Sequence, residues 1–364
     1  MGREMDTNRT VRLAGREADT SRTTPPAGAP HEEGLPGAED AETLYLDRTP
    51  RGSHDAQGGQ PEGCASAFAT SDAVGCAVSR PGSSHLEVGV ECQDYSLVGA
   101  IDVAQGGGRV FCAIASDGVG SARLSADGSR IAATAAMDFL RRRLGGLPPD
   151  PEVTFDRMTW QAWVREAFVE ALTAVYRHAE EAGVSPASLD ATLDVVLLTR
   201  HGLAFWGHSG DGGIIARRGR RTKVLTRRLG GRNGSVYPLR FADTWEFGCA
   251  EGVESVLLAT DGMFNVLTRR WPCGRRTART REVARLAHVA ARDGGQDELA
   301  RELSGQPMGV SDDKTVAAIS VVRRQAGLWR RAGNGGEGPL AAGGQGNRGG
   351  HHASNGRRGR RRDR

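Results

Sequence analysis

The sequence predicts an α+β fold, in which helices and antiparallel strands occupy separate stretches of the chain. Apolar side chains recur at helical spacing over residues 125–143 and 160–182. Residues 189–225 instead break into short apolar runs separated by tight turns. These runs follow one another with no helix-length segment between them, which indicates an antiparallel meander and not alternating strands and helices.

The two ends of the chain have the composition of disordered segments. Residues 1–72 are rich in Gly, Pro, Thr, Glu and Asp and contain few large apolar side chains, so they cannot bury enough surface to offset the entropy cost of ordering. Residues 324–364 are rich in Gly and end in an Arg-rich run. We therefore expect one folded domain over residues 73–323 of the 364-residue chain.

The folded part is organised around a buried strand that ends in an acidic turn. Val110–Ala115 is a continuous apolar run, typical of a strand buried on both faces, and Asp117-Gly118 follows it. The same arrangement recurs where the run 256–259 leads to Asp261-Gly262, and a third acidic pair, Asp312-Asp313, precedes the last apolar run. Each Asp-Gly pair alone is also an ordinary turn sequence. Together the acidic pairs favour a metal site.

The remaining elements are read from local patterns along the chain. A strand is expected at 74–78, then a turn through His85, then a strand containing Tyr95 and Leu97 with Asp94 at its start. The two helices follow, separated by the proline-rich break at 148–151. Later strands are expected at 193–199, 203–206, 213–217, 222–225, 253–259 and 315–322, with one or two helices over 281–303 and a surface flap over 226–244.

Four acidic positions at strand ends or tight turns could converge at one edge of a pair of sheets: Asp94, Asp117, Asp261 and Asp312. Crowded carboxylates raise one another's pKa, so a site that keeps them ionised implies bound cations. Oxygen ligands without His or Cys favour Mg²⁺ or Mn²⁺ over zinc. Two such ions would activate a water towards phosphorus, so hydrolysis of a phosphate monoester is one reading. Structural calcium-type binding and unrelated surface turns are the alternatives.

The order and the sequences of five motifs resemble those of the metal-dependent serine/threonine phosphatases of type 2C, and more closely those of their bacterial branch. The resemblance spans about residues 75–322. Its motifs are Ser84-His85 with Cys92-Gln93-Asp94, Ala115-Ser116-Asp117-Gly118-Val119-Gly120, Gly207-His208-Ser209-Gly210-Asp211-Gly212, Ala259-Thr260-Asp261-Gly262 and Ser311-Asp312-Asp313-Lys314-Thr315. The fold that it implies is a four-layer α-β-β-α sandwich with two antiparallel sheets.

The resemblance also implies roles for single residues. Asp117 is similar to the carboxylate that bridges two metal ions, and the Gly118 carbonyl to a ligand of one of them. Asp261 and Asp312 resemble further ligands, and Asp94 resembles the residue that contacts water on the metals. Two more positions are expected to be structural, with Asp211 bracing a hairpin near the site and Thr192 matching a small hydroxyl residue of the core.

The chain departs from the family pattern at the position that grips phosphate. Many members have an Arg shortly upstream of the Asp94 equivalent, but no Arg lies between Arg80 and Asp94 here, and Gln93 replaces a Glu. His85 is the nearest candidate for a phosphate contact or a general acid, with a solvated loop His as the alternative. The family's Asn after the last metal ligand is Asp313 here, so either Asp312 or Asp313 could be the ligand.

Charge and cysteine content limit the partners and the compartment. The formal net charge is +4, but residues 357–364 carry six Arg and one Asp, which leaves 42 basic and 43 acidic residues elsewhere. We therefore interpret the basic end as a solvated tail and expect no nucleic-acid partner. The six cysteines show no metal or disulfide spacing, and neither a signal peptide nor a run of about 20 apolar residues is present. We expect a cytoplasmic monomer that does not bind membranes.

The function that the resemblance implies is a signalling enzyme. It would hydrolyse phosphoserine and phosphothreonine in a protein that a Ser/Thr kinase has modified, with two Mn²⁺ or Mg²⁺ ions as cofactors. Asp94 and His85 would be its catalytic residues, and Asp94, Asp117, Gly118, Asp261 and Asp312 its metal ligands. The alternative is a catalytically silent phosphoprotein-binding or scaffold module on the same fold.

Overall fold

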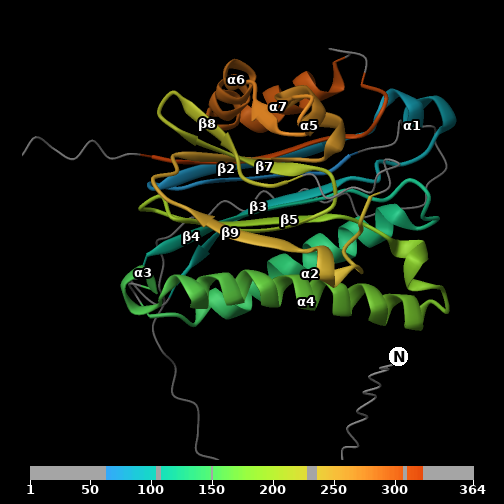
Figure 1. Cartoon of the computed structure of the whole chain (residues 1–364), viewed down its shortest axis with the longest axis horizontal. Helices are drawn as coiled ribbons and strands as arrows, with labels where there is room; N and C mark the ends of the chain where they lie inside the picture. Colours follow the sequence, from blue (N-terminus) through green and yellow to red (C-terminus); the bar gives the residue numbers. More distant parts are fainter. Residues whose placement is uncertain (1–62, 104–107, 149–150, 228–235, 306–309, 323–364) are drawn as a thin grey trace, which may run out of the picture. The chain divides into compact units, whose positions relative to one another are not determined.

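The computed structural model describes residues 63–103, 108–148, 151–227, 236–305 and 310–322. The predictions for residues 1–62, for residues 323–364 and for the middle of the 226–244 flap lie outside these ranges. The described part is a stack of four layers, in which two antiparallel sheets lie face to face and helices cover both outer faces (Figure 1). The predicted α+β sandwich is therefore confirmed.

The first sheet has six strands in the order β1-β2-β13-β10-β7-β8. Every pair of neighbours in it is antiparallel. Its strands are β1 (Ala65–Ala69), β2 (Ala73–Arg80), β7 (Gly213–Arg218), β8 (Arg221–Val224), β10 (Ser255–Ala259) and β13 (Lys314–Val321). The last strand of the chain thus lies at the centre of the sheet, between the second strand and β10.

The second sheet has five strands in the order β3-β4-β5-β6-β9, again all antiparallel. They are β3 (Tyr95–Asp102), β4 (Arg109–Ser116), β5 (Leu193–Thr199), β6 (Ala204–Ser209) and β9 (Glu246–Ala250). A separate hairpin is formed by β11 (Thr268–Arg270) and β12 (Arg276–Ala278). The predicted meander is therefore divided between two sheets, because β7 and β8 join the first sheet while β5 and β6 stay in the second.

Helices cover the outer faces of both sheets. On the second sheet lie α2 (Ser125–Gly145) and α4 (Arg157–Glu181), and on the first lie α5 (Asp261–Leu267), α6 (Thr280–Ala290) and α7 (Gly295–Ser304) (Figure 1). Four short elements complete the list: α1 (Ser83–Val88), α3 (Pro151–Thr154) and the 3₁₀ turns Pro186–Leu189 and Ala242–Thr244. None of the helices in the described ranges has the length and apolar content needed to cross a membrane.

The core explains why the strand sequences lack an alternating pattern. The central strands of both sheets are covered on both faces, by the other sheet and by helices, so every residue of Leu193–Thr199 is buried. Between the sheets the ring of Phe68 stacks on that of Phe111, with ring centroids 5.7 Å apart. Since Phe68 belongs to β1, this contact anchors a strand that precedes the predicted start of the domain at residue 73.

The structure differs from the sequence predictions at several short elements. Residues 83–88 form α1 where a turn was predicted, and the hairpin β11–β12 and the strand β9 were not predicted at all. Residues 281–303 are two helices, α6 and α7, with Gly294 in the left-handed conformation between them. Such short elements carry little periodicity, and tertiary contacts determine them.

Candidate functional site

The acidic residues predicted to form a site lie at one end of the sandwich. Because neighbouring strands are antiparallel, the end at which β4 and β10 finish is the end at which β3, β7 and β13 begin. Asp117 directly follows β4, and Asp261, separated from β10 by Thr260 alone, is the first residue of α5. Asp94 and Asp312 lie just before β3 and β13, and Asp211 lies just before β7. The topology therefore gathers carboxylates from both sheets.

The electrostatics of Asp117 show how close these carboxylates are. Desolvation raises the pKa of Asp117 well above its ordinary value, and the negative charges of four other residues raise it further: Asp94, Asp261, Asp211 and Asp312. The three other predicted metal-site aspartates thus all act electrostatically on Asp117. Asp211 was predicted to be structural. We count it in the same cluster because its charge also raises the pKa of Asp117.

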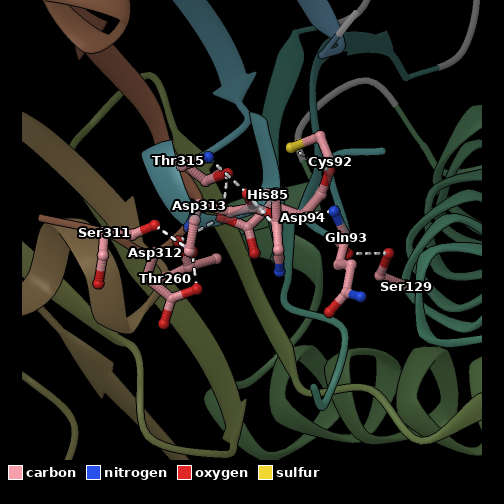
Figure 2. A network of polar contacts seen from close by, with 12 residues as sticks. His85, Cys92, Gln93, Asp94, Ser129, Thr260, Ser311, Asp312, Asp313 and Thr315 are labelled. Carbon is pink, nitrogen blue, oxygen red and sulfur yellow. Dashed lines mark hydrogen bonds and ion pairs between the residues drawn. The ribbon is translucent and has the colours of Figure 1, made fainter. Parts of the chain in front are cut away.

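Asp94 connects the two sheets through hydrogen bonds. Its Oδ2 accepts from the hydroxyl of Thr260 at 2.7 Å and from that of Thr315 at 2.8 Å (Figure 2). Thr260 follows β10 and Thr315 lies in β13, so both donors belong to the first sheet, whereas Asp94 leads into the second. The carboxyl is 3 % exposed, and its Oδ1 has no hydrogen-bond partner among the described residues. Burial, followed by the charges of Asp313 and Asp312, raises the pKa of Asp94.

The main chain around Asp117 is fixed by Thr192. The Asp117 N–H donates to Thr192 Oγ1 at 2.9 Å, and the Thr192 N–H donates to the Asp117 carbonyl at 2.8 Å. The next residue must be glycine, because a Cβ on Gly118 would approach the Ser125 backbone to 2.8 Å at the start of α2. The hydroxyl residue that the family resemblance singled out at position 192 therefore acts on the turn that presents Asp117.

Asp313 is fully occupied by contacts other than the carboxylate cluster. Its Oδ1 accepts from the Gly82 N–H and faces His85 Nδ1, both at 2.7 Å, and its Oδ2 accepts from the Gln93 N–H at 2.6 Å (Figure 2). The side chain is 3 % exposed. Asp312 next to it is exposed and acts on both Asp94 and Asp117. Of the two residues, Asp312 is thus the more exposed, whereas both oxygens of Asp313 already have partners.

A buried ion pair lies in the strands behind the cluster. Asp194 in β5 and His208 in β6 are direct cross-strand partners, and His208 Nδ1 lies 2.5 Å from Asp194 Oδ1. The other ring nitrogen, Nε2, lies 3.0 Å from the carbonyl oxygen of Arg227. An imidazolium, with a proton on both ring nitrogens, would donate to both acceptors. Burial lowers the pKa of His208, but the Asp194 carboxylate, with smaller contributions from Glu246 and the Arg227 carbonyl, outweighs this and raises it above the ordinary value.

The donors present fit a hard divalent cation. As they stand, no three His, Cys, Asp or Glu side chains in the described ranges are close enough together to enclose one ion. The cluster nevertheless consists of oxygen donors alone, several of its charges oppose one another, and the Asp94 Oδ1 is buried without a partner. Mutual repulsion and an unsatisfied carboxylate oxygen are both relieved by a cation such as Mg²⁺ or Mn²⁺.

Sequence reasoning missed the residues that hold the acidic ones in place. Thr260 and Thr315 position Asp94 from 166 and 221 residues away in the chain, and Ser129 of α2 donates to the Gln93 carbonyl at 2.6 Å. No local pattern marks such contacts. The one available signal was that Thr260 and Thr315 lie inside two of the five motifs.

Comparisons with known proteins identify the family of the chain. The family model described as "Protein phosphatase 2C" matches residues 81–304. Among solved structures, the chain is similar to serine/threonine phosphatase Stp1 from Staphylococcus aureus (12% identity, 68% of this chain and 94% of that chain, TM-score 0.44). It is also similar to the serine/threonine phosphatase of S. agalactiae (14%, 69% and 100%, TM-score 0.46) and to PppA of Pseudomonas aeruginosa (17%, 69% and 99%, TM-score 0.46). A comparison with curated protein sequences finds no match.

Proposed function

Since this chain belongs to the protein phosphatase 2C family, we propose that it hydrolyses phosphoserine and phosphothreonine in proteins with the help of two bound Mg²⁺ or Mn²⁺ ions. The observation that carries the proposal is the gathering of Asp94, Asp117, Asp211, Asp261 and Asp312 at one end of the sandwich. A catalytically silent descendant would have no need to keep this destabilising cluster of carboxylates.

The residues that would hold the ions are those that the sequence predicts. Asp117 would bridge them, with the Gly118 carbonyl, Asp261 and Asp312 as further ligands and Asp94 in contact with the water shell. When bound, Mg²⁺ or Mn²⁺ would lower the pKa of the attacking water and neutralise charge on the phosphoryl oxygens. The chain's part is to fix these ligands, and Thr192 supports this by holding the Asp117 main chain on both sides.

Asp94 is suited to orient the attacking water. Its Oδ2 is committed to Thr260 and Thr315, so the carboxyl cannot rotate without losing two hydrogen bonds. The free Oδ1 is the oxygen left to accept a proton from water. Fixed orientation of the nucleophile is worth several kcal/mol of barrier in well-built sites, on the order of 7–11 at best.

His85 is suited to protonate the leaving oxygen. Asp313 faces its Nδ1 and thereby selects the ring orientation in which Nε2 is available to substrate. A serine or threonine alkoxide is a poor leaving group and needs a proton, and a positioned His supplies about 10²–10⁴-fold in such steps. Asp313 is the positioning residue of this arrangement.

We expect His85→Ala to lower kcat on a phosphothreonine peptide by about 100-fold and kcat on p-nitrophenyl phosphate by less than about threefold, since nitrophenolate leaves without a proton. Asp313→Asn should show the same difference between the two substrates with a smaller loss, because it keeps the shape but removes one acceptor. Initial rates with both substrates check this. An equal loss on both substrates would mean that the two residues only support the structure.

The function itself is tested with the full chain, a phosphothreonine peptide and p-nitrophenyl phosphate, in Mn²⁺, in Mg²⁺ and in chelator. We expect turnover of both substrates with either metal and none in chelator. Metal at 100 times its dissociation constant should also stabilise the fold by about 2.7 kcal/mol, measured as a rise in melting temperature. A chain that binds metal and remains folded, yet turns over neither substrate, would instead be the silent phosphoprotein-binding module.

The cognate Ser/Thr kinase, the signalling role, the monomeric state and the cytoplasmic location stay predictions. Each follows from the family resemblance or from the composition of the chain. Pull-down by a trapping variant such as Asp117→Asn, in the presence of metal, would identify the phosphoprotein substrate, and the kinase that modifies this substrate could then be sought.

A further inference from the structure

A basic groove lies beside the edge of the first sheet. It has a volume of about 810 Å³ and runs between strand β8 with the residues after it and the hairpin β11–β12. The two walls meet at one end, where the hydroxyls of Thr222 and Thr280 are 2.8 Å apart. At the other end the groove is lined by Arg227 and Glu246 on one side and by the hairpin turn at Arg275 on the other.

The groove has a surplus of positive charge. Its basic lining residues are Lys223, Arg227, Arg275 and Arg276, against Glu246 as the one acidic lining residue. Glu246 is already engaged, because its Oε2 accepts from the Arg227 N–H at 2.9 Å. Lys223 and Arg275 are exposed, and neither has an ion-pair partner among the described residues. Since the chain apart from residues 357–364 is almost neutral, this surplus is a local feature.

Three exposed arginines are sequence or strand neighbours of groove-lining residues. Arg221 lies at the start of β8, and Arg269 and Arg270 lie in β11. In the described part of the chain none of the three pairs with a carboxylate. Unpaired cations that converge from two separate hairpins indicate a surface for a partner of opposite charge.

The shape of the groove favours an extended peptide. Strand β8 is the last strand of its sheet, and among the described residues it pairs only with β7. Its second edge therefore presents backbone donors and acceptors towards the groove, which is the feature that an added peptide strand uses. The half-exposed Trp271 would be the natural platform for a nucleic-acid base, but the Arg269 guanidinium lies over its ring at 5.1 Å.

The groove leads towards the acidic cluster. The Thr226 hydroxyl in its wall accepts from the N–H of Ile214, near the start of β7, and Asp211 lies two residues before that strand begins. At the same end, the Arg227 carbonyl accepts from His208. A chain lying along β8 would therefore continue in the direction of the candidate metal site.

We propose that this groove binds an extended acidic segment of the phosphoprotein substrate, a proposal that rests on the proposed function for its link to catalysis. The enzyme would then select sites that have Glu or Asp residues at a distance from the phosphorylated side chain. The cluster would act on the phosphate, while Lys223 and Arg275 would supply affinity and steering.

The test compares two charge-reversed double variants of the full chain. Lys223→Glu/Arg275→Glu alters the groove, and Arg177→Glu/Arg301→Glu alters two exposed arginines on α4 and α7 as the matched control. The probe is a fluorescein-labelled, unphosphorylated peptide of alternating Glu and Thr, followed by fluorescence anisotropy. We expect the groove variant to bind it about tenfold or more weakly at low ionic strength and the control to bind it like the parent. The Arg-rich end, 357–364, is present in all three proteins, so a difference between them reports the groove.

Activity separates this proposal from the proposed function. With phosphothreonine peptides flanked by Glu or by Gln, the groove variant should lose kcat/KM on the Glu peptide alone, and its rate on p-nitrophenyl phosphate should stay unchanged. Equal binding by the groove and control variants would overturn the proposal, as would an oligothymidylate of the same charge that binds more tightly and loses affinity in the same variant. If no phosphate ester is hydrolysed but the Glu-Thr peptide still depends on Lys223 and Arg275, the proposed function fails and the acidic-segment site stands.

Discussion

Replacing Asp117 by Asn is expected to lower turnover of any phosphate ester by about 10³-fold or more while the protein stays folded. The loss follows because the residue would bridge both ions, and several kcal/mol of transition-state stabilisation depend on them, at about 1.4 kcal/mol per factor of ten. Steady-state rates in saturating Mn²⁺ measure the effect. A variant that keeps the parental rate would contradict the assignment of Asp117 and with it the two-ion proposal.

The same substitution should stabilise the metal-free protein. The charges of Asp94, Asp261, Asp211 and Asp312 all oppose ionisation of Asp117, and the isosteric amide removes that repulsion. Urea unfolding in chelator should therefore show a higher midpoint for Asp117→Asn than for the parent. Opposite signs in activity and in metal-free stability would distinguish a functional carboxylate from a structural one.

Replacing Asp194 by Asn is expected to cost about 3 kcal/mol of unfolding free energy near neutral pH. It removes the carboxylate that faces the fully buried His208 ring, and breaking a buried ion pair from one side costs roughly 3–5 kcal/mol. Urea unfolding of the parent and the variant measures the difference. His208→Gln and the double variant complete the cycle, and a coupling free energy near zero would show that the two side chains do not act as a pair.

The same pair gives a dependence of stability on pH with a definite sign. The pKa of His208 is raised in the folded state, so the folded protein holds the proton more tightly than the unfolded chain does. The stabilisation is complete below the unfolded value of about 6.5 and is lost as the pH rises through the raised folded value. The parent should therefore lose stability on the alkaline side, and Asp194→Asn should show a flatter profile over the same range. A parent whose stability rises with pH there would contradict the imidazolium assignment.

The parts of the fold that could be predicted are those with a strong local signal. The apolar run ending at Asp117 and the run ending at Asp261 are buried strands, as predicted, because burial on both faces leaves an uninterrupted apolar sequence. These strands end beside the starts of β3 and β13. This arrangement depends on strand pairing, which no local sequence pattern contains. The family motifs supplied that information indirectly.

The parts that could not be predicted depend on contacts distant in sequence. The surroundings of Asp312 and Asp313 could not be told apart from two adjacent identical residues, because the N–H groups that bind Asp313 belong to Gly82 and Gln93, more than 200 positions away. The hairpin β11–β12 has three-residue strands rich in Arg, with no alternation to detect. The basic groove could not be predicted for the same reason, since its two walls come from separate parts of the chain.

Because Asp94 hydrogen-bonds to Thr260 and Thr315, the geometry of the candidate site depends on how the two sheets are aligned. Asp117 and Asp94 adjoin strands of the second sheet, and Asp261 and Asp312 adjoin strands of the first. Sliding one sheet past the other by an ångström would separate these carboxylates, so a bound ion would resist relative movement of the two sheets. Binding of the ions should then slow backbone amide hydrogen exchange at the strand ends of both sheets together, although the ions would contact only a few residues of each sheet.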